Sequence, residues 1–148
     1  MRYARDIPRI LFAGVVAALV AAFVAGAVAT LLSAPQLSVS AIAIGGFFGV
    51  IYGIKLTIGP AIVLGGLLWL RRVRSALVWA ATGALGGLGG YCFLALPGVQ
   101  YDVSALFTAP EALILLAASL LAGIAGAFIF RLMMETLTAF NDDGYDYD

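Results

Sequence analysis

Long apolar runs separated by short polar segments dominate the pattern of this chain. Residues 10–32, 75–96 and 113–130 carry no charged side chain, and residues 39–70 carry only Lys55. A helix needs about 20 apolar residues to cross the hydrocarbon core of a bilayer, which is roughly 30 Å thick. The pattern therefore predicts an all-α integral membrane protein, a four-helix transmembrane bundle formed by residues 1–140. The predicted spans are residues 10–32, 47–70, 75–96 and 113–131.

The run over residues 39–70 is too long for one upright span. At 1.5 Å per residue a helix of this length reaches about 48 Å, well beyond the bilayer core. We therefore expect a long second helix with its span at 47–70. Residues 39–46 then either extend this helix on the outer side or re-enter the membrane. A kink is expected at Gly59–Pro60, because proline removes a backbone donor and crowds the preceding turn.

The arginines indicate how the chain is oriented. With four spans, all seven fall on the same side of the membrane, namely Arg2, Arg5, Arg9, Arg71, Arg72, Arg74 and Arg131. The positive-inside rule makes that side cytoplasmic, so both ends of the chain are predicted to be cytoplasmic. A five-span arrangement would place the cluster 71–74 outside, and the same rule disfavours it.

Two tryptophans flank the central arginine cluster. Trp69 and Trp79 lie where aromatic side chains collect at the membrane–water interface, so we expect them to anchor the helices together with Arg71, Arg72 and Arg74. Binding of an anionic lipid head group by the arginines is the alternative interpretation of the same cluster.

Composition supports a membrane location. Of the 148 residues, 64% are hydrophobic and 11% are charged, against about 45–50% and about 25% in soluble domains. The net charge is zero, which gives no reason to expect a nucleic-acid partner. These values are typical of a small multi-pass protein of a cell membrane, such as the bacterial inner membrane, with the lipid bilayer as its first partner.

The two ends of the chain need separate interpretations. The first apolar run is longer than the 7–15-residue core of a secretory signal, so we expect it to be retained as a span. The tail over residues 141–148 carries four aspartates and no apolar anchor. It is predicted to be an acidic, cytoplasmic and disordered segment.

Small residues recur at intervals of four in every predicted span. Such rows let two helices approach closely in lipid, where hiding apolar surface gains little. We expect the small faces to meet inside the bundle or at a dimer interface, with the bulky faces toward lipid. The glycines predicted to lie at helix contacts are Gly45, Gly49, Gly53, Gly86, Gly90, Gly123 and Gly126.

Lys55 is the one charge inside a predicted span. An ionisable group at such a position either snorkels to the interface or marks a functional cavity. The acids expected on the outer side are Asp102 and Glu111. Glu111 opens the fourth span, where an acid is also favoured by the helix dipole. Lys55 and Glu111 are therefore predicted to form a contact, and they are the candidate polar or transport site.

Residues that carry catalysis are scarce in this sequence. It contains no histidine and a single cysteine, Cys92, which lies in an apolar run. No spacing indicates a catalytic centre, a cofactor site or a metal site. We therefore expect a non-enzymatic membrane subunit or scaffold that associates with itself or with a larger membrane complex. The alternative is a small transporter or channel component that uses Lys55 in an outward-side polar cavity.

Overall fold

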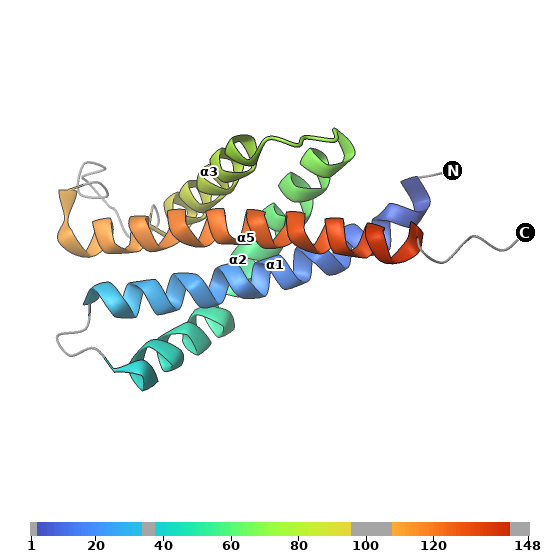
Figure 1. Cartoon of the computed structure of the whole chain (residues 1–148). Helices are drawn as coiled ribbons and strands as arrows, with labels where there is room; N and C mark the ends of the chain where they lie inside the picture. Colours follow the sequence, from blue (N-terminus) through green and yellow to red (C-terminus); the bar gives the residue numbers. More distant parts are fainter. Residues whose placement is uncertain (1–2, 34–37, 96–107, 143–148) are drawn as a thin grey trace, which may run out of the picture.

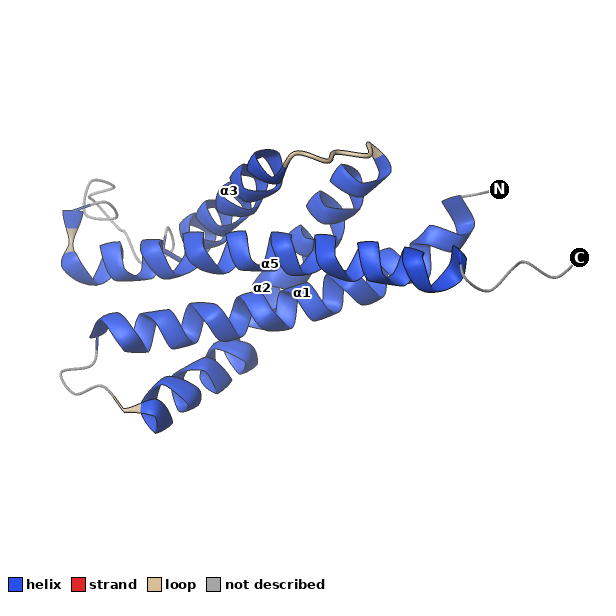
Figure 2. Ribbon diagram, viewed as in Figure 1, coloured by secondary structure: helices blue, strands red, loops and turns tan. Residues whose placement is uncertain are grey.

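The computed structural model describes residues 3–33, 38–95 and 108–142. This part of the chain is helical apart from short turns and caps, and it contains no strand (Figure 2). The helices are α1 (Tyr3–Ser33), α2 (Val39–Leu70), α3 (Ala76–Ala95) and α5 (Pro110–Asp142). All four are long and apolar enough to cross a membrane.

The first and last of these helices form the centre of the molecule. α1 and α5 lie side by side and antiparallel, as Figure 1 shows. α2 packs on α1, and α3 packs on α5, whereas α2 touches α3 and α5 at only a few places. The order across the bundle is therefore α2, α1, α5, α3, and the bundle is poorly closed between α2 and α3.

One end of the molecule gathers the arginine-bearing segments. The start of α1, the turn between α2 and α3, and the end of α5 lie at the same end in Figure 1. These segments contain every arginine of the described residues. Successive helices therefore run in opposite directions, and the two ends of the helical part lie at the same end of the molecule. Arg2 lies outside the described residues.

The helix starts have local causes. Ser38 precedes α2 in an extended conformation, and its hydroxyl accepts the backbone N–H of Ala41 at 3.1 Å. This N-cap satisfies a donor that the first turn of a helix leaves free. α5 begins at Pro110, whose missing N–H costs nothing in a first turn, and Glu111 follows beside the positive end of the helix dipole.

The second helix is continuous over its whole length. α2 has 32 residues, so residues 39–46 form its first turns. Pro60 lies inside it, and the kink expected at Gly59–Pro60 stays a prediction. α5 includes the first two residues of the predicted acidic tail, while residues 143–148 lie outside the described residues.

The turn over residues 71–75, which we call the arginine turn, ends α2 with a Schellman motif. The N–H of Arg72 donates to the carbonyl of Trp69 at 2.8 Å, and the N–H of Val73 donates to Leu68 at 3.1 Å. Arg72 has φ of 54°, in the left-handed region that favours glycine. A side chain there strains the backbone by about 1 kcal/mol.

Substituting Arg72→Gly is therefore expected to stabilise the protein by about 1 kcal/mol, since glycine adopts a positive φ without a Cβ clash. Arg72→Ala removes the same charge but keeps the clash, so it serves as the matched control. The free energy of unfolding can be measured by titration with SDS in mixed micelles. Equal values for the two variants would show that the backbone conformation is not the cause.

Mostly small side chains of α1 pack against its two neighbours, α2 and α5. The buried apolar residues of α1 are Ile10, Ala13, Ala17, Ala18, Ala21 and Ala22. Larger residues of the same helix, such as Phe12, Leu19 and Phe23, are exposed on the outside of the chain. Apolar side chains on the outside and alanines inside are the arrangement expected of helices that pack in lipid.

Candidate functional site

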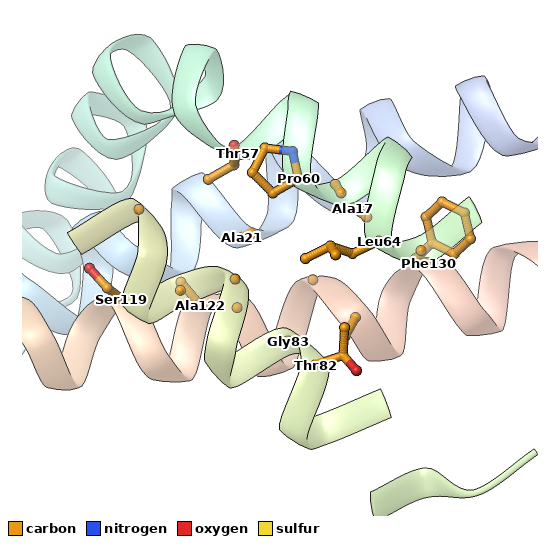
Figure 3. Close-up of a pocket in the computed structure, with 18 of the residues that line it drawn as sticks. Ala17, Ala21, Thr57, Pro60, Leu64, Thr82, Gly83, Ser119, Ala122 and Phe130 are labelled. Atoms are coloured by element: carbon orange, nitrogen blue, oxygen red, sulfur yellow. The ribbon is translucent and has the colours of Figure 1, made fainter. Parts of the chain in front are cut away.

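The four helices line a partly open apolar cavity where α2 and α3 touch at only a few places. Its volume is about 140 Å³, and every helix contributes to its wall (Figure 3). α1 and α5 supply alanines and glycines, α2 supplies larger aliphatic residues, and Trp79 and Phe130 lie at one end. The lining residues from α2 are Gly53, Leu56, Thr57, Pro60, Ala61, Leu64, Gly65 and Leu68.

The lining of this cavity is suited to hydrocarbon. None of its residues is charged, and its side-chain hydroxyls belong to Thr57, Thr82 and Ser119. The Thr57 hydroxyl lies 3.2 Å from the carbonyl of Ala18 on α1 and 3.2 Å from that of Gly53, so its proton is directed to the backbone. The cavity therefore offers little to an ion and much to an apolar group.

Leaving this space empty would be unfavourable. Atoms that line unfilled space lose dispersion contacts, so an apolar cavity of about 140 Å³ favours an apolar occupant. Engineered apolar cavities of about 150 Å³ stay free of water and bind molecules such as benzene. The site is thus large enough for several carbon atoms of an apolar ligand.

Lys55 does not belong to this cavity. It is exposed and is absent from the cavity wall. At 100° per residue, Lys55 lies about 200° around α2 from Gly53, which lies against Ala22 of α1. Its side chain therefore leaves the helix on the side opposite to α1.

The predicted contact between Lys55 and Glu111 is wrong. Both residues are exposed, and the ion pairs within 4.0 Å among the described residues join Arg9 to Asp6 and Arg131 to Glu135. The physical reason is the order of the helices, since α2 reaches α5 at only a few places. The two residues do not form a joint polar site.

The length of α2 determines how far Lys55 lies from the two ends of this apolar helix. It follows Val39 by 16 residues in a helix of 32, so it lies at the middle of α2. The 15 residues from Lys55 to Leu70 span about 22 Å of helix. For a helix tilted by up to about 40° with Leu70 at one membrane boundary, Lys55 would lie about 17–22 Å into a core of about 30 Å. The four-carbon stem of a lysine covers only part of the distance to the opposite boundary.

The arginine turn presents three cations at one end of the cavity. Arg71, Arg72 and Arg74 are exposed, and they form no ion pair with an acid among residues whose side chains the structure describes. Leu68 precedes the turn, and Trp79 follows it, and both of these residues line the cavity. The positive charge and the apolar cavity thus share an end of the same two helices.

The two tryptophans have different environments. Trp69 is half-buried, but Trp79 is only 1% exposed, so its prediction as an interfacial anchor is wrong. Its ring stacks on Phe130 with 6.0 Å between centroids, and its indole N–H donates to the carbonyl of Val73 at 2.9 Å. Because this hydrogen bond satisfies the polar edge of the ring, the side chain can turn inward.

Several glycines lie where two helix backbones touch. A methyl group on Gly49 would collide with the Ala22 carbonyl oxygen, and one on Gly123 would collide with the Gly83 carbonyl oxygen. Gly45 is closed off in the same way by the side chain of Thr30. At these positions no side chain fits unless the helices move apart.

The remaining predicted glycines are less crowded. A methyl group would contact Ala22 at Gly53, Leu64 at Gly86 and Ala21 at Gly126, at 3.4, 3.4 and 3.0 Å respectively. At Gly90 a methyl group meets nothing within 4 Å, so Gly90 makes no close helix contact within the chain, and a contact at a dimer interface stays a prediction. Gly90 lines the cavity.

The sequence-based set of contact glycines left out three closely packed positions, and the cavity was not predicted. At Gly26, Gly83 and Gly87 a side chain would collide with the carbonyl oxygens of Gly45, Gly123 and Ser119 respectively. All three belong to the rows of small residues spaced by four, but the spacing alone does not show which members of a row are packed most closely. The cavity depends on which helices are neighbours, and no local pattern carries that information.

The described residues hold no other chemical centre. They contain no group of three or more histidine, cysteine, aspartate or glutamate residues placed to bind a metal ion. Cys92 is a free, half-buried thiol. In comparisons with known proteins, the chain matches no protein-family model, no curated protein and no solved structure.

Proposed function

We propose that this chain is a non-enzymatic, multi-pass subunit of a cell membrane that acts by associating with another transmembrane protein through the outer face of α2. Its four helices cross the bilayer with both ends in the cytoplasm. The proposal rests on one observation, the exposed lysine at the middle of α2.

A lone lysine at this depth needs an acceptor. Placing a charge in the middle of a span costs several kcal/mol unless it is paired or reaches water. Lys55 forms no ion pair among the described residues and has no access to the cavity. An acceptor supplied by a neighbouring protein removes this cost, and exposed apolar residues of α2 such as Phe48, Ile51 and Tyr52 leave room for such a neighbour near Lys55.

The acceptor is a carboxylate on a different protein. In this chain the described acids outside the tail are Asp6, Glu111 and Glu135, which lie toward the ends of α1 and α5. A second copy of the chain would hold these acids near the membrane surfaces, far from the level of Lys55. We therefore infer a partner helix that carries an aspartate or glutamate in its own span.

Photocross-linking in membranes tests this association. A photoreactive residue at Ile51, exposed and one turn before Lys55, is expected to cross-link to a transmembrane segment that contains a carboxylate. The same probe at Leu85, on the outer side of α3, is the control. In Lys55→Leu the Ile51 cross-link should fall about tenfold, which is the effect of losing about 1.4 kcal/mol, whereas Lys55→Arg should retain it.

The outcomes separate the alternatives. Exchanging the charges, with Lys55→Glu and a lysine in place of the partner's acid, should restore the cross-link. Products that contain only lipid or a second copy of the chain would contradict the proposal. So would an Ile51 cross-link that is unchanged in Lys55→Leu, because the association would then not depend on the lysine.

A further inference from the structure

We infer that the cavity between α2 and α3 binds an acyl chain of an anionic phospholipid, whose phosphate is held by the arginine turn. The site lies on the opposite side of α2 from Lys55, so it is independent of the proposed partner helix.

The wall of the cavity selects hydrocarbon. It contains no charge, and the Thr57 hydroxyl is directed to backbone carbonyls and not to a ligand. Its volume of about 140 Å³ is close to that of apolar cavities that bind benzene. A cavity of this size can also hold several methylene groups of an acyl chain. Water would lose hydrogen bonds on entering this space and is a poor occupant.

The chain of a lipid can enter from the side. α2 and α3 meet at only a few places, and the cavity lies in the gap between them (Figure 3). On α3, Gly86 and Gly90 line the cavity and project no side chain into it. In a bilayer, lipid acyl chains surround such a gap, so an acyl chain can enter the cavity directly from the membrane.

The arginine turn determines which lipid binds. Its three exposed arginines have no acidic partner among the described side chains, and guanidinium groups form paired hydrogen bonds with phosphate oxygens. A lipid with a net negative charge is attracted to such a cluster more strongly than a zwitterionic one. A phosphate at the arginine turn directs the acyl chain past Trp79 toward Gly86.

Quenching of Trp79 fluorescence by brominated lipids tests this assignment. The chain has two tryptophans, so Trp69→Phe leaves Trp79 as the reporter. Trp79 lines the cavity but is 1% exposed, which shields it from lipids that merely surround the protein. In vesicles, 6,7-dibromo phosphatidylglycerol is expected to quench it at least twice as strongly as 6,7-dibromo phosphatidylcholine at the same bromine content.

A matched pair of variants separates cavity binding from general contact with lipid. Gly86→Leu places a side chain in the cavity beside Leu64 and should reduce the quenching by phosphatidylglycerol to half or less. Gly89→Leu, on the outer side of α3, meets nothing within 4 Å, does not line the cavity, and should leave the quenching unchanged. Replacing Arg71 and Arg74 by glutamine should abolish the difference between the two lipids.

Two results of the quenching experiment would overturn the inference. Equal quenching by the two lipids would mean that the arginine turn does not select an anion. No quenching by either lipid would mean that the cavity holds no acyl chain. Circular dichroism of each variant shows whether it is folded. If Gly86→Leu fails to fold, native mass spectrometry of the Trp69→Phe protein should still find retained phosphatidylglycerol, and its absence would count against the site.

Discussion

Replacing Gly123 by leucine is expected to destabilise the protein by more than about 3 kcal/mol, at the upper end of overpacking effects. Even a methyl group at this position would collide with the Gly83 carbonyl oxygen and lie 2.9 Å from the Gly87 backbone nitrogen. Backbone atoms of a packed helix cannot turn aside as a flexible side chain can. α3 would therefore have to move off α5, which is its main neighbour.

Gly89→Leu is the control for this effect. The same side chain is added to the same helix pair, but a methyl group at Gly89 meets nothing within 4 Å. We expect a change within about 0.5 kcal/mol, as for most exposed substitutions. The free energy of unfolding, measured by SDS titration, decides the matter. If the two leucine variants unfold alike, α3 does not dock on α5 through Gly123.

Trp79→Ala is expected to cost about 3–5 kcal/mol, the usual range for removing a large buried aromatic ring. The ring is among the largest fully buried side chains, and it stacks on Phe130 of α5. Trp79→Phe keeps most of the packing but loses the hydrogen bond to Val73, so it should cost about 1 kcal/mol more than packing alone predicts. Unfolding by SDS measures both variants.

Trp69→Ala provides the comparison for this prediction. Trp69 is half-buried at the last turn of α2 and should tolerate truncation with a much smaller loss. If Trp79→Ala lowers the free energy of unfolding no more than Trp69→Ala does, Trp79 lies at the membrane interface and not in the core. The Trp79 fluorescence maximum gives independent evidence, because a buried indole emits at shorter wavelength than one at the interface.

The number of helices and their apolar character could be predicted from the sequence because each depends on one segment at a time. Long uncharged runs require internally bonded backbone in lipid, and this fixes the helices without reference to their neighbours. The order of the helices could not be predicted. It depends on which small-residue faces meet, and α3 carries glycines at 83, 86, 87, 89 and 90, which lie on several sides of the helix.

Trp79 shows why the candidate sites were harder to predict than the spans. It lies four residues after Ser75, within one helical turn of the arginine turn, so its sequence position fits both an interface and a core. Only the position of Phe130, far along the chain, decides between them. Lys55 was correctly identified as the one charge in a run, but its direction depends on the face of α2 that meets α1.

The pairing of α1 with α5 has a consequence for how the protein is made. Among these four helices α1 leaves the ribosome first and α5 last, yet they form the centre together. The hairpin of α1 and α2 can assemble early, whereas α3 must wait for α5 before it has a neighbour to cover its glycines. A nascent chain halted before α5 would therefore leave α3 without its packing partner and exposed to membrane proteases.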